Sequence, residues 1–216
     1  MIQNMVIIDK TPPPILDRDG NVYTEVIIGS QTWLVENLKA KQTADGTSIP
    51  IVTTDVLWAA QTPSTSIGCC WYDDDESTYS DYGLLYTGMA AQLDITKKFI
   101  VGYHVPTQAE LTTLITYLLG QFHAGGALKE QNTDHWNSPN EINSEPDSGF
   151  NAYGSGERYG TGDGRSFNFG EGANYWSSTA SGADDTYYME LYRSSVSTYS
   201  SNKINNLGFS IRLIKD

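Results

Sequence analysis

The sequence predicts an α+β fold, because separate segments carry the patterns of strands and of a helix. Apolar residues alternate over Val22–Ile28 and again over Phe209–Ile214, and one apolar stripe at helical spacing follows Thr107. The chain has 216 residues and 39% apolar content, which is enough for one domain with its own core. We therefore expect a domain over residues 17–216, preceded by an arm over residues 1–16.

The arm is expected to be extended. Val6–Ile8 predicts one short strand, and Pro12–Pro14 excludes helix and stiffens the chain. Such an arm docks either on its own domain or on a partner, and the sequence leaves both open. The segment lacks the apolar stretch and small-residue cleavage site of a signal peptide. Either the chain is not exported by that route or a signal has been removed.

A hairpin is predicted at the start of the domain. The DRDG stretch at Asp17–Gly20 is a turn signal, and Val22–Ile28 then alternates as a strand. A tight turn at Gly29–Ser30 leads into the return strand Gln31–Val35. We expect the tryptophan and leucine of this return strand to enter the core.

Two helices are predicted after a loop over Lys39–Ser66. The clearer helix has Thr107 as its N-cap and Glu110 three residues later, which is a capping box. Gly120 ends it, and its apolar stripe consists of Leu111, Leu114, Ile115, Leu118 and Leu119. A shorter helix rich in small residues is expected at Leu84–Leu93.

The segment Gly125–Gly170 is rich in Gly, Asn, Ser and Pro, yet large side chains recur through it. We therefore expect an ordered loop region that these side chains hold in place. They are Leu128, Trp136, Phe150, Tyr153, Tyr159, Phe167 and Phe169. After it we expect a strand over Tyr188–Tyr192, a turn at Ser194–Ser195, a return strand over Val196–Ser201 and the closing strand.

Composition excludes some functions and leaves others open. The net charge is −13 and no run of Lys or Arg is present, which argues against nonspecific nucleic-acid binding. The acidity favours solubility, with a cationic partner or bound metal ion as the alternative. No apolar stretch is long enough for a membrane span. Cys69 and Cys70 are adjacent, which argues against a disulfide framework, and we expect both to be buried as small apolar residues.

No catalytic motif is visible, so we expect a protein that is not an enzyme. The sequence contains no G-x-S-x-G, and the glycine-rich stretch Gly154–Arg165 lacks the G-K-[ST] of a phosphate loop. Asp184 and Asp185 are adjacent, so on a strand they would point to opposite faces. An enzyme of unrecognised type that uses surface carboxylates remains the alternative.

One stretch favours calcium, although no cofactor is expected. Asp73, Asp74 and Asp75, with Glu76 and Asp81 nearby, crowd oxygen ligands of the kind that calcium prefers. The EF-hand spacing is absent. The Glu145-Pro146-Asp147 sequence weakly resembles a calcium motif of C-type lectins. The alternative for both stretches is an acidic, solvated loop.

Eight segments, taken together and in this order, resemble the Fibrobacter succinogenes major paralogous domain family over about residues 20–216. They are VYTEVIIGSQTWLVENLKA, WYDDDESTYSDYGLLYTGMAA, YHVPTQAELTTLITYLLG, GGALKE, WNSPN, SGFNAYGSGER, YWSSTA and NKINNLGFSIRLIKD. That family is similar to the formylglycine-generating sulfatase-modifying enzymes. The resemblance implies a C-type-lectin-like fold, with two helices around a small twisted antiparallel sheet and long ordered loops. The active-site cysteines of those enzymes have no counterpart after Cys70, so their oxidase activity is not implied.

The layout YWSST…GFSIR also resembles the variable region of retroelement-diversified proteins, including phage receptor-binding proteins. Such a region implies an exposed ligand face near the C-terminus, and Tyr, Ser and Asn suit recognition. We expect a cell-surface carbohydrate or protein to bind there. The virion of a phage is one expected location, and the arm would meet a second copy or a virion partner; a bacterial surface protein is the alternative. The expected ligand-binding residues are Asp184, Asp185, Tyr187, Tyr188, Glu190, Tyr192, Arg193 and Tyr199.

Overall fold

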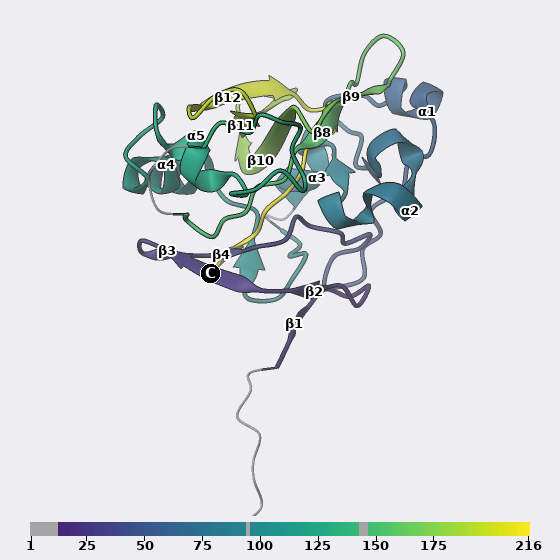
Figure 1. The fold of residues 1–216 in the computed structure, drawn as a ribbon. Helices are drawn as coiled ribbons and strands as arrows, with labels where there is room; N and C mark the ends of the chain where they lie inside the picture. Colours follow the sequence, from purple (N-terminus) through teal and green to yellow (C-terminus); the bar gives the residue numbers. More distant parts are fainter. Residues whose placement is uncertain (1–12, 94–95, 143–146) are drawn as a thin grey trace, which may run out of the picture.

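The fold is given by a computed structural model that describes residues 13–93, 96–142 and 147–216. Strands dominate it and the helices are short, so the expected mixture of helices and strands is confirmed at that level (Figure 1). No helix in these residues is long and apolar enough to cross a membrane. The strand predicted at Val6–Ile8 lies outside the described residues.

A small hairpin opens the described chain. β1 (Ile15–Leu16) pairs antiparallel with β2 (Val22–Tyr23), so this first strand lies inside the segment expected to be an arm. The carboxylate of Asp17 holds the turn between them. It accepts hydrogen bonds from the Asn21 amide at 2.9 Å and from the Tyr23 hydroxyl at 2.7 Å. The turn predicted from the DRDG sequence is therefore confirmed.

The predicted opening hairpin is confirmed as part of a four-stranded sheet. β3 (Glu25–Ile28) pairs with β4 (Gln31–Leu34), and β13 (Ile214–Lys215) lies between β4 and β7 (Tyr103–His104). Trp33 of β4 is fully buried, as expected. The C-terminal strand thus pairs beside the first long hairpin of the domain, which brings the two ends of the domain together (Figure 1).

A five-stranded sheet occupies the other side of the molecule. Its order is β12-β11-β10-β8-β9, and only the β8–β10 pairing is parallel. β8 (Ser155–Arg158) and β9 (Ser166–Phe169) come from the segment predicted as loop, as does most of α5 (Ala124–Leu128). The loop prediction is wrong for these three elements. Each has only four or five residues, which is too short for a strand or helix pattern to be recognised in the sequence alone. The remaining strands are β10 (Gly172–Ala180), β11 (Asp185–Tyr192) and β12 (Thr198–Ile204).

The segment before the last strand joins the two sheets. The Trp176 amide of β10 donates to the Ser210 carbonyl at 3.0 Å, and the Leu34 amide of β4 donates to the Leu213 carbonyl at 2.9 Å. Only Ile214–Lys215 forms a regular strand, so the predicted closing strand is shorter than expected. The segment before this strand bonds first to β10 and then to β4, so it does not form one continuous set of hydrogen bonds with a single strand.

The capped helix is confirmed as α4 (Gln108–Tyr117). Thr107 and Glu110 form the reciprocal capping box, and Leu111, Leu114 and Ile115 are buried. Leu119 is 61% exposed, because the helix ends before it and its backbone turns left-handed at φ 67°. α4 and α5 lie beside β11 and β12 (Figure 1).

The other elements are short. The predicted helix at Leu84–Leu93 is confirmed only from Gly88, because its first residues pair as a strand instead. The short elements not yet described are α1 (Asp55–Ala59), β5 (Cys69–Cys70), η1 (Tyr72–Asp74), α2 (Glu76–Tyr79), η2 (Ser80–Tyr82), β6 (Leu85–Tyr86) and α3 (Gly88–Leu93).

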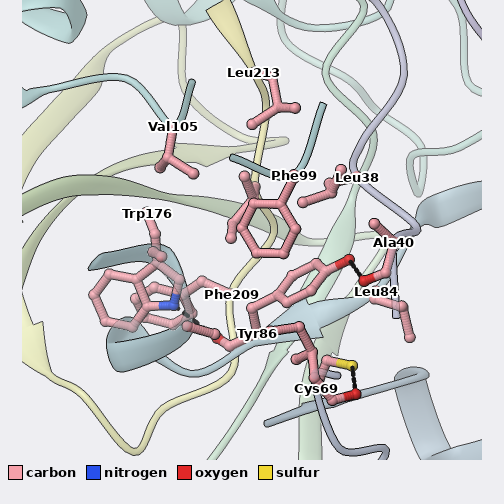
Figure 2. Packing of buried hydrophobic residues seen from close by; sticks show 14 of the residues in the cluster. Leu38, Ala40, Cys69, Leu84, Tyr86, Phe99, Val105, Trp176, Phe209 and Leu213 are labelled. Carbon is pink, nitrogen blue, oxygen red and sulfur yellow. Dashed lines mark hydrogen bonds between the residues drawn. The ribbon is translucent and has the colours of Figure 1, made fainter. Parts of the chain in front are cut away.

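An aromatic core fills the space between the two sheets. Figure 2 shows the Phe209 ring against Trp176, whose indole N–H donates to the Tyr86 carbonyl at 2.8 Å. The Tyr86 hydroxyl in turn donates to the Ala40 carbonyl at 2.8 Å. The buried polar tips of Trp176 and Tyr86 thus both have a partner, as burial favours. Cys69 lies in the same cluster and Cys70 in a neighbouring one, so the predicted burial of both cysteines is confirmed.

Candidate ligand-binding face

The five-stranded sheet has two faces, and β11 shows how they differ. Met189 and Leu191 belong to the inner face, where they pack with residues of α4 and α5. Tyr188 and Glu190 belong to the opposite face. Tyr188 is covered there by the core cluster that contains residues of α3, whereas Glu190 and Tyr192 are at least partly open to solvent. The second face is therefore closed at one end and open at the other.

Strand register brings side chains from all five strands onto the open end. Asn174 of β10 lies opposite Glu190, and Glu190 lies opposite Tyr199 of β12. The Asn174 side-chain amide donates to the Glu157 carboxylate of β8 at 3.4 Å, and Phe167 of β9 lies opposite Glu157. We call this surface the carboxylate–tyrosine face. Its members are Glu157, Tyr159, Phe167, Asn174, Glu190, Tyr192, Tyr199, Ser201 and Lys203.

Four aromatic side chains on this face remain open to solvent. The exposed fractions are 38% for Tyr192, 47% for Tyr199, 40% for Tyr159 and 41% for Phe167. The rings of Tyr159 and Phe167 meet edge to face with centroids 4.7 Å apart. A Cβ added to Gly172 would lie 3.4 Å from the Tyr192 ring, so that ring rests against the strand. The rings of Tyr159, Phe167 and Tyr192, held in this way, lose little freedom when a partner binds.

Two carboxylates lie among these rings. Glu157 accepts a hydrogen bond from the Asn168 side-chain amide at 2.6 Å. Burial raises the pKa of Glu157, and the nearby Glu190 carboxylate adds to the rise, while Asn168 and Lys203 oppose it. Glu190 accepts a hydrogen bond from the Tyr188 hydroxyl at 2.9 Å. Both carboxylates have further lone pairs that can accept hydrogen bonds from the hydroxyl groups of a ligand.

Tyr188 does not belong to the exposed surface predicted for it. It is only 3% exposed, and its ring lies 5.1 Å from the Phe209 ring and 6.2 Å from the Trp176 ring. Burial and the hydrogen bond to Glu190 raise the pKa of Tyr188. Its contribution to the face is therefore indirect, since its hydroxyl orients the Glu190 carboxylate.

Four further predicted residues lie away from this face. Asp184 is exposed in the bend before β11, and Asp185 and Tyr187 lie on the same face of the strand as Met189, opposite the carboxylate–tyrosine face. The Arg193 guanidinium forms an ion pair with Glu171 and donates to the Pro139 carbonyl at 3.3 Å, so it is occupied within the domain. The structure thus brings together Glu190, Tyr192 and Tyr199 of the predicted set.

Other members of the face were not predicted from sequence. Glu157, Phe167, Asn174 and Lys203 come from four different strands, and Tyr159 directly follows the first of these, β8. The alternation of Phe167 and Phe169 in SFNF was the only local signal for β9. Nothing in the sequence indicated that β8 pairs in parallel with β10, and this pairing is what places Glu157 beside Asn174.

The three aspartates predicted to hold calcium do not converge. Asp74 binds both terminal nitrogens of the fully buried Arg158, at 2.9 and 3.2 Å. Asp75 caps α2 by accepting from two backbone amides, and Asp73 is exposed at a left-handed φ of 48°. No group of three metal-ligating side chains occurs anywhere in the described chain. Glu145 and Pro146, from the second calcium prediction, lie outside the described residues.

A family model for the Fibrobacter succinogenes major domain matches residues 26–215. The chain belongs to this family. The match covers the five-stranded sheet, all of the four-stranded sheet except Glu25, and every member of the carboxylate–tyrosine face, so the face is part of the Fibrobacter succinogenes major domain itself. No curated protein and no solved structure matched the chain.

Proposed function

We propose that this Fibrobacter succinogenes major domain is a noncatalytic recognition module that binds a cell-surface carbohydrate through its carboxylate–tyrosine face. The observation that carries the proposal is the set of four half-exposed aromatic rings around Glu157 and Glu190. Aromatic rings stack on the apolar face of a sugar, while carboxylate and amide groups bind its hydroxyls. A protein ligand would use the same rings and is the other partner that the composition favours.

We also propose that the fold is C-type-lectin-like, as the family resemblance implies. In support, α4 lies beside a mostly antiparallel five-stranded sheet, long irregular segments connect the elements, and the last strand pairs beside the opening hairpin. This arrangement leaves the end of the chain to build the ligand face. It agrees with a module whose scaffold and recognition surface are separate.

A glycan array is the first experiment, followed by titration calorimetry with the best ligand. We expect Tyr192→Ala and Tyr199→Ala to weaken binding at least tenfold, which corresponds to about 1.4 kcal/mol for each ring. Tyr117→Ala is the matched control, since Tyr117 is 60% exposed on α4 and lies outside this face. Unchanged affinity in both face variants, or an equal loss in the control, would contradict the proposal. Repeating the array with a chelator tests calcium dependence.

Glycan hydrolysis is the second candidate, because a carboxyl group with a raised pKa beside a second carboxylate is the arrangement of a general acid and its partner. In that case Glu157 would protonate the leaving oxygen and Glu190 would be the second carboxyl group of the pair. Release of reducing ends by the wild type, abolished in Glu157→Gln, would favour it. Binding without turnover would favour the recognition module.

The location at a virion or a bacterial surface is part of the same proposal. The stretch of Ser, Asn, Tyr and Asp residues at 181–206 forms β11, β12 and their connections, and β12 exposes Ser200, Ser201 and Asn202. Such positions tolerate change because no core depends on them. A neighbouring reverse transcriptase gene, with a near-copy of the 3′ coding end, would support diversification of this stretch.

A further inference from the structure

The connection between β11 and β12 is held at almost every residue by the segment around α5. The Gly126 amide donates to the Val196 carbonyl at 3.0 Å, and the Thr198 amide donates to the Gln121 carbonyl at 2.8 Å. Gly125 approaches the same connection so closely that an added Cβ would lie 2.3 Å from the Ser197 carbonyl oxygen. The connection is therefore fixed against α5 rather than left free in solvent.

Lys129, immediately after α5, supplies the central contact. Its side chain is fully buried, and its ammonium donates to the carbonyls of Tyr192 at 2.9 Å, Arg193 at 3.2 Å and Ser195 at 2.9 Å. An ammonium has three donors, so these three carbonyls use all of them. The ammonium also lies 5.7 Å from the centre of the Trp136 ring. This lysine has no donor left for a ligand or for water.

The three carbonyls belong to the chain between the two tyrosines of the proposed ligand face. Tyr192 ends β11 and itself provides one of the carbonyls, while Tyr199 is the second residue of β12. The Tyr192 carbonyl also accepts from the Ser195 amide at 3.2 Å and the Arg193 carbonyl from the Glu141 amide at 2.6 Å, whereas the Ser195 carbonyl depends on the ammonium among the described residues. A buried backbone carbonyl without a donor is destabilising, so the ammonium helps to keep the connection in this shape. The spacing of the two rings depends on that shape.

We propose that Lys129 is a positioning residue of the carboxylate–tyrosine face, whose buried ammonium fixes the β11–β12 connection and thereby the placement of Tyr192 and Tyr199. The importance of this placement rests on the proposed function, whereas the ordering of the connection does not. Lys129 touches no ligand; it acts through three backbone carbonyls.

Burial lowers the pKa of Lys129 to about 8, and the Glu141 carboxylate opposes the shift. Two other pairs of charged groups lie near the ammonium. Arg193, whose carbonyl accepts from the ammonium, forms an ion pair with Glu171, and Glu130, the next residue along the chain, pairs with His135. A neutral amine has only two donors and one lone pair, so loss of the proton removes one of the three hydrogen bonds from Lys129 to the connection. The ordering of the connection should therefore depend on pH near 8.

Amide hydrogen exchange of the full chain tests this without any ligand. The reporters are the amides of Arg193, Ser195 and Thr198, which donate to the carbonyls of Glu171, Tyr192 and Gln121 and so depend on the placement of the connection. The amides of α4 serve as the internal reference. In Lys129→Met we expect at least tenfold faster exchange at the reporters, with α4 changed much less. In the wild type, corrected for intrinsic rates, reporter protection should fall between pH 7 and pH 9. Lys129→Arg, which stays charged, should keep its protection over that range.

Two results would overturn the proposal. One is unchanged reporter exchange in Lys129→Met. The other is an equal increase at the reporters and in α4, which would show a general loss of stability. Should Lys129→Met fail to fold, the wild type is compared with Lys129→Arg across pH instead. Wild-type reporter amides whose corrected protection is constant from pH 7 to pH 9 would then refute the proposal. Absence of glycan binding would refute the proposed function and leave this test intact.

Discussion

Replacing Arg212 with methionine should destabilise the domain without changing its outer surface. The Arg212 side chain is completely buried, and its guanidinium donates to the Asn37 side-chain oxygen at 2.6 and 3.1 Å and to the Phe150 carbonyl. It also lies 4.5 Å from the centre of the Phe150 ring. No carboxylate pairs with it in the described chain. Methionine has a similar length but no donor.

The expected loss follows from these contacts. Leaving the Asn37 oxygen and the Phe150 carbonyl without donors costs about 1–3 kcal/mol each. Loss of the cation–π contact adds about 1 kcal/mol. Removing a buried charge offsets part of this, because burial already lowers the pKa of Arg212 and so disfavours its charged form. We expect a net decrease of about 3 kcal/mol in the free energy of unfolding, a large share of a domain's usual stability.

Urea unfolding followed by tryptophan fluorescence measures the change, since the chain has 5 Trp. The matched control is Lys215→Met, which removes an exposed ion pair with Glu25 and should cost less than about 1 kcal/mol. A lower midpoint with an unchanged denaturant slope is expected for Arg212→Met. If Arg212→Met were no more destabilising than the control, the assigned role of the buried guanidinium would be refuted.

Two further predictions follow from shifted pKa values. Burial raises the pKa values of the Cys69 and Cys70 thiols, so neither should react with a thiol reagent at pH 8 until urea unfolds the chain; rapid reaction of the native protein would contradict their burial. Folding raises the pKa of Glu157 above its ordinary value of 4.5, so the folded state binds more protons, and the stability from this carboxyl is present below pH 4.5 and lost as pH rises through the folded value. The unfolding free energy of Glu157→Gln minus that of the wild type should therefore be more positive at pH 7 than at pH 4. An equal difference at the two pH values would refute this.

The parts of the fold predicted correctly from sequence are those fixed by local pattern. The capping box and the apolar stripe identified α4, and the alternation around the Gly29–Ser30 turn identified the β3–β4 hairpin. The closing segment was predicted as one strand over Phe209–Ile214, yet its residues serve two sheets in turn. Local alternation reports which residues are buried, but it does not report which neighbours share their hydrogen bonds.

The candidate site was predicted only in part, for a related reason. Tyr192 and Tyr199 were recognised because the residues of β11 and β12 lie close together along the chain. Tyr188 has the same chemistry as these two and the same strand phase as Tyr192, yet α3 and Phe209 cover it. Exposure along one strand thus changes where a distant element stops, and Glu157 enters the site through a parallel pairing that no local signal reveals.

Three buried cations explain how a domain with short helices holds its irregular segments. A connection that enters the interior needs donors for its carbonyls, and side chains must supply them where no strand is adjacent. Lys129 donates to the β11–β12 connection, Arg158 to the Gly164 carbonyl, and Arg212 to the Phe150 carbonyl. Because each cation supplies several donors from one rigid position, one side chain fixes a whole turn. Under the proposed function, the outer strands are then free to carry polar and aromatic residues for contact with a ligand.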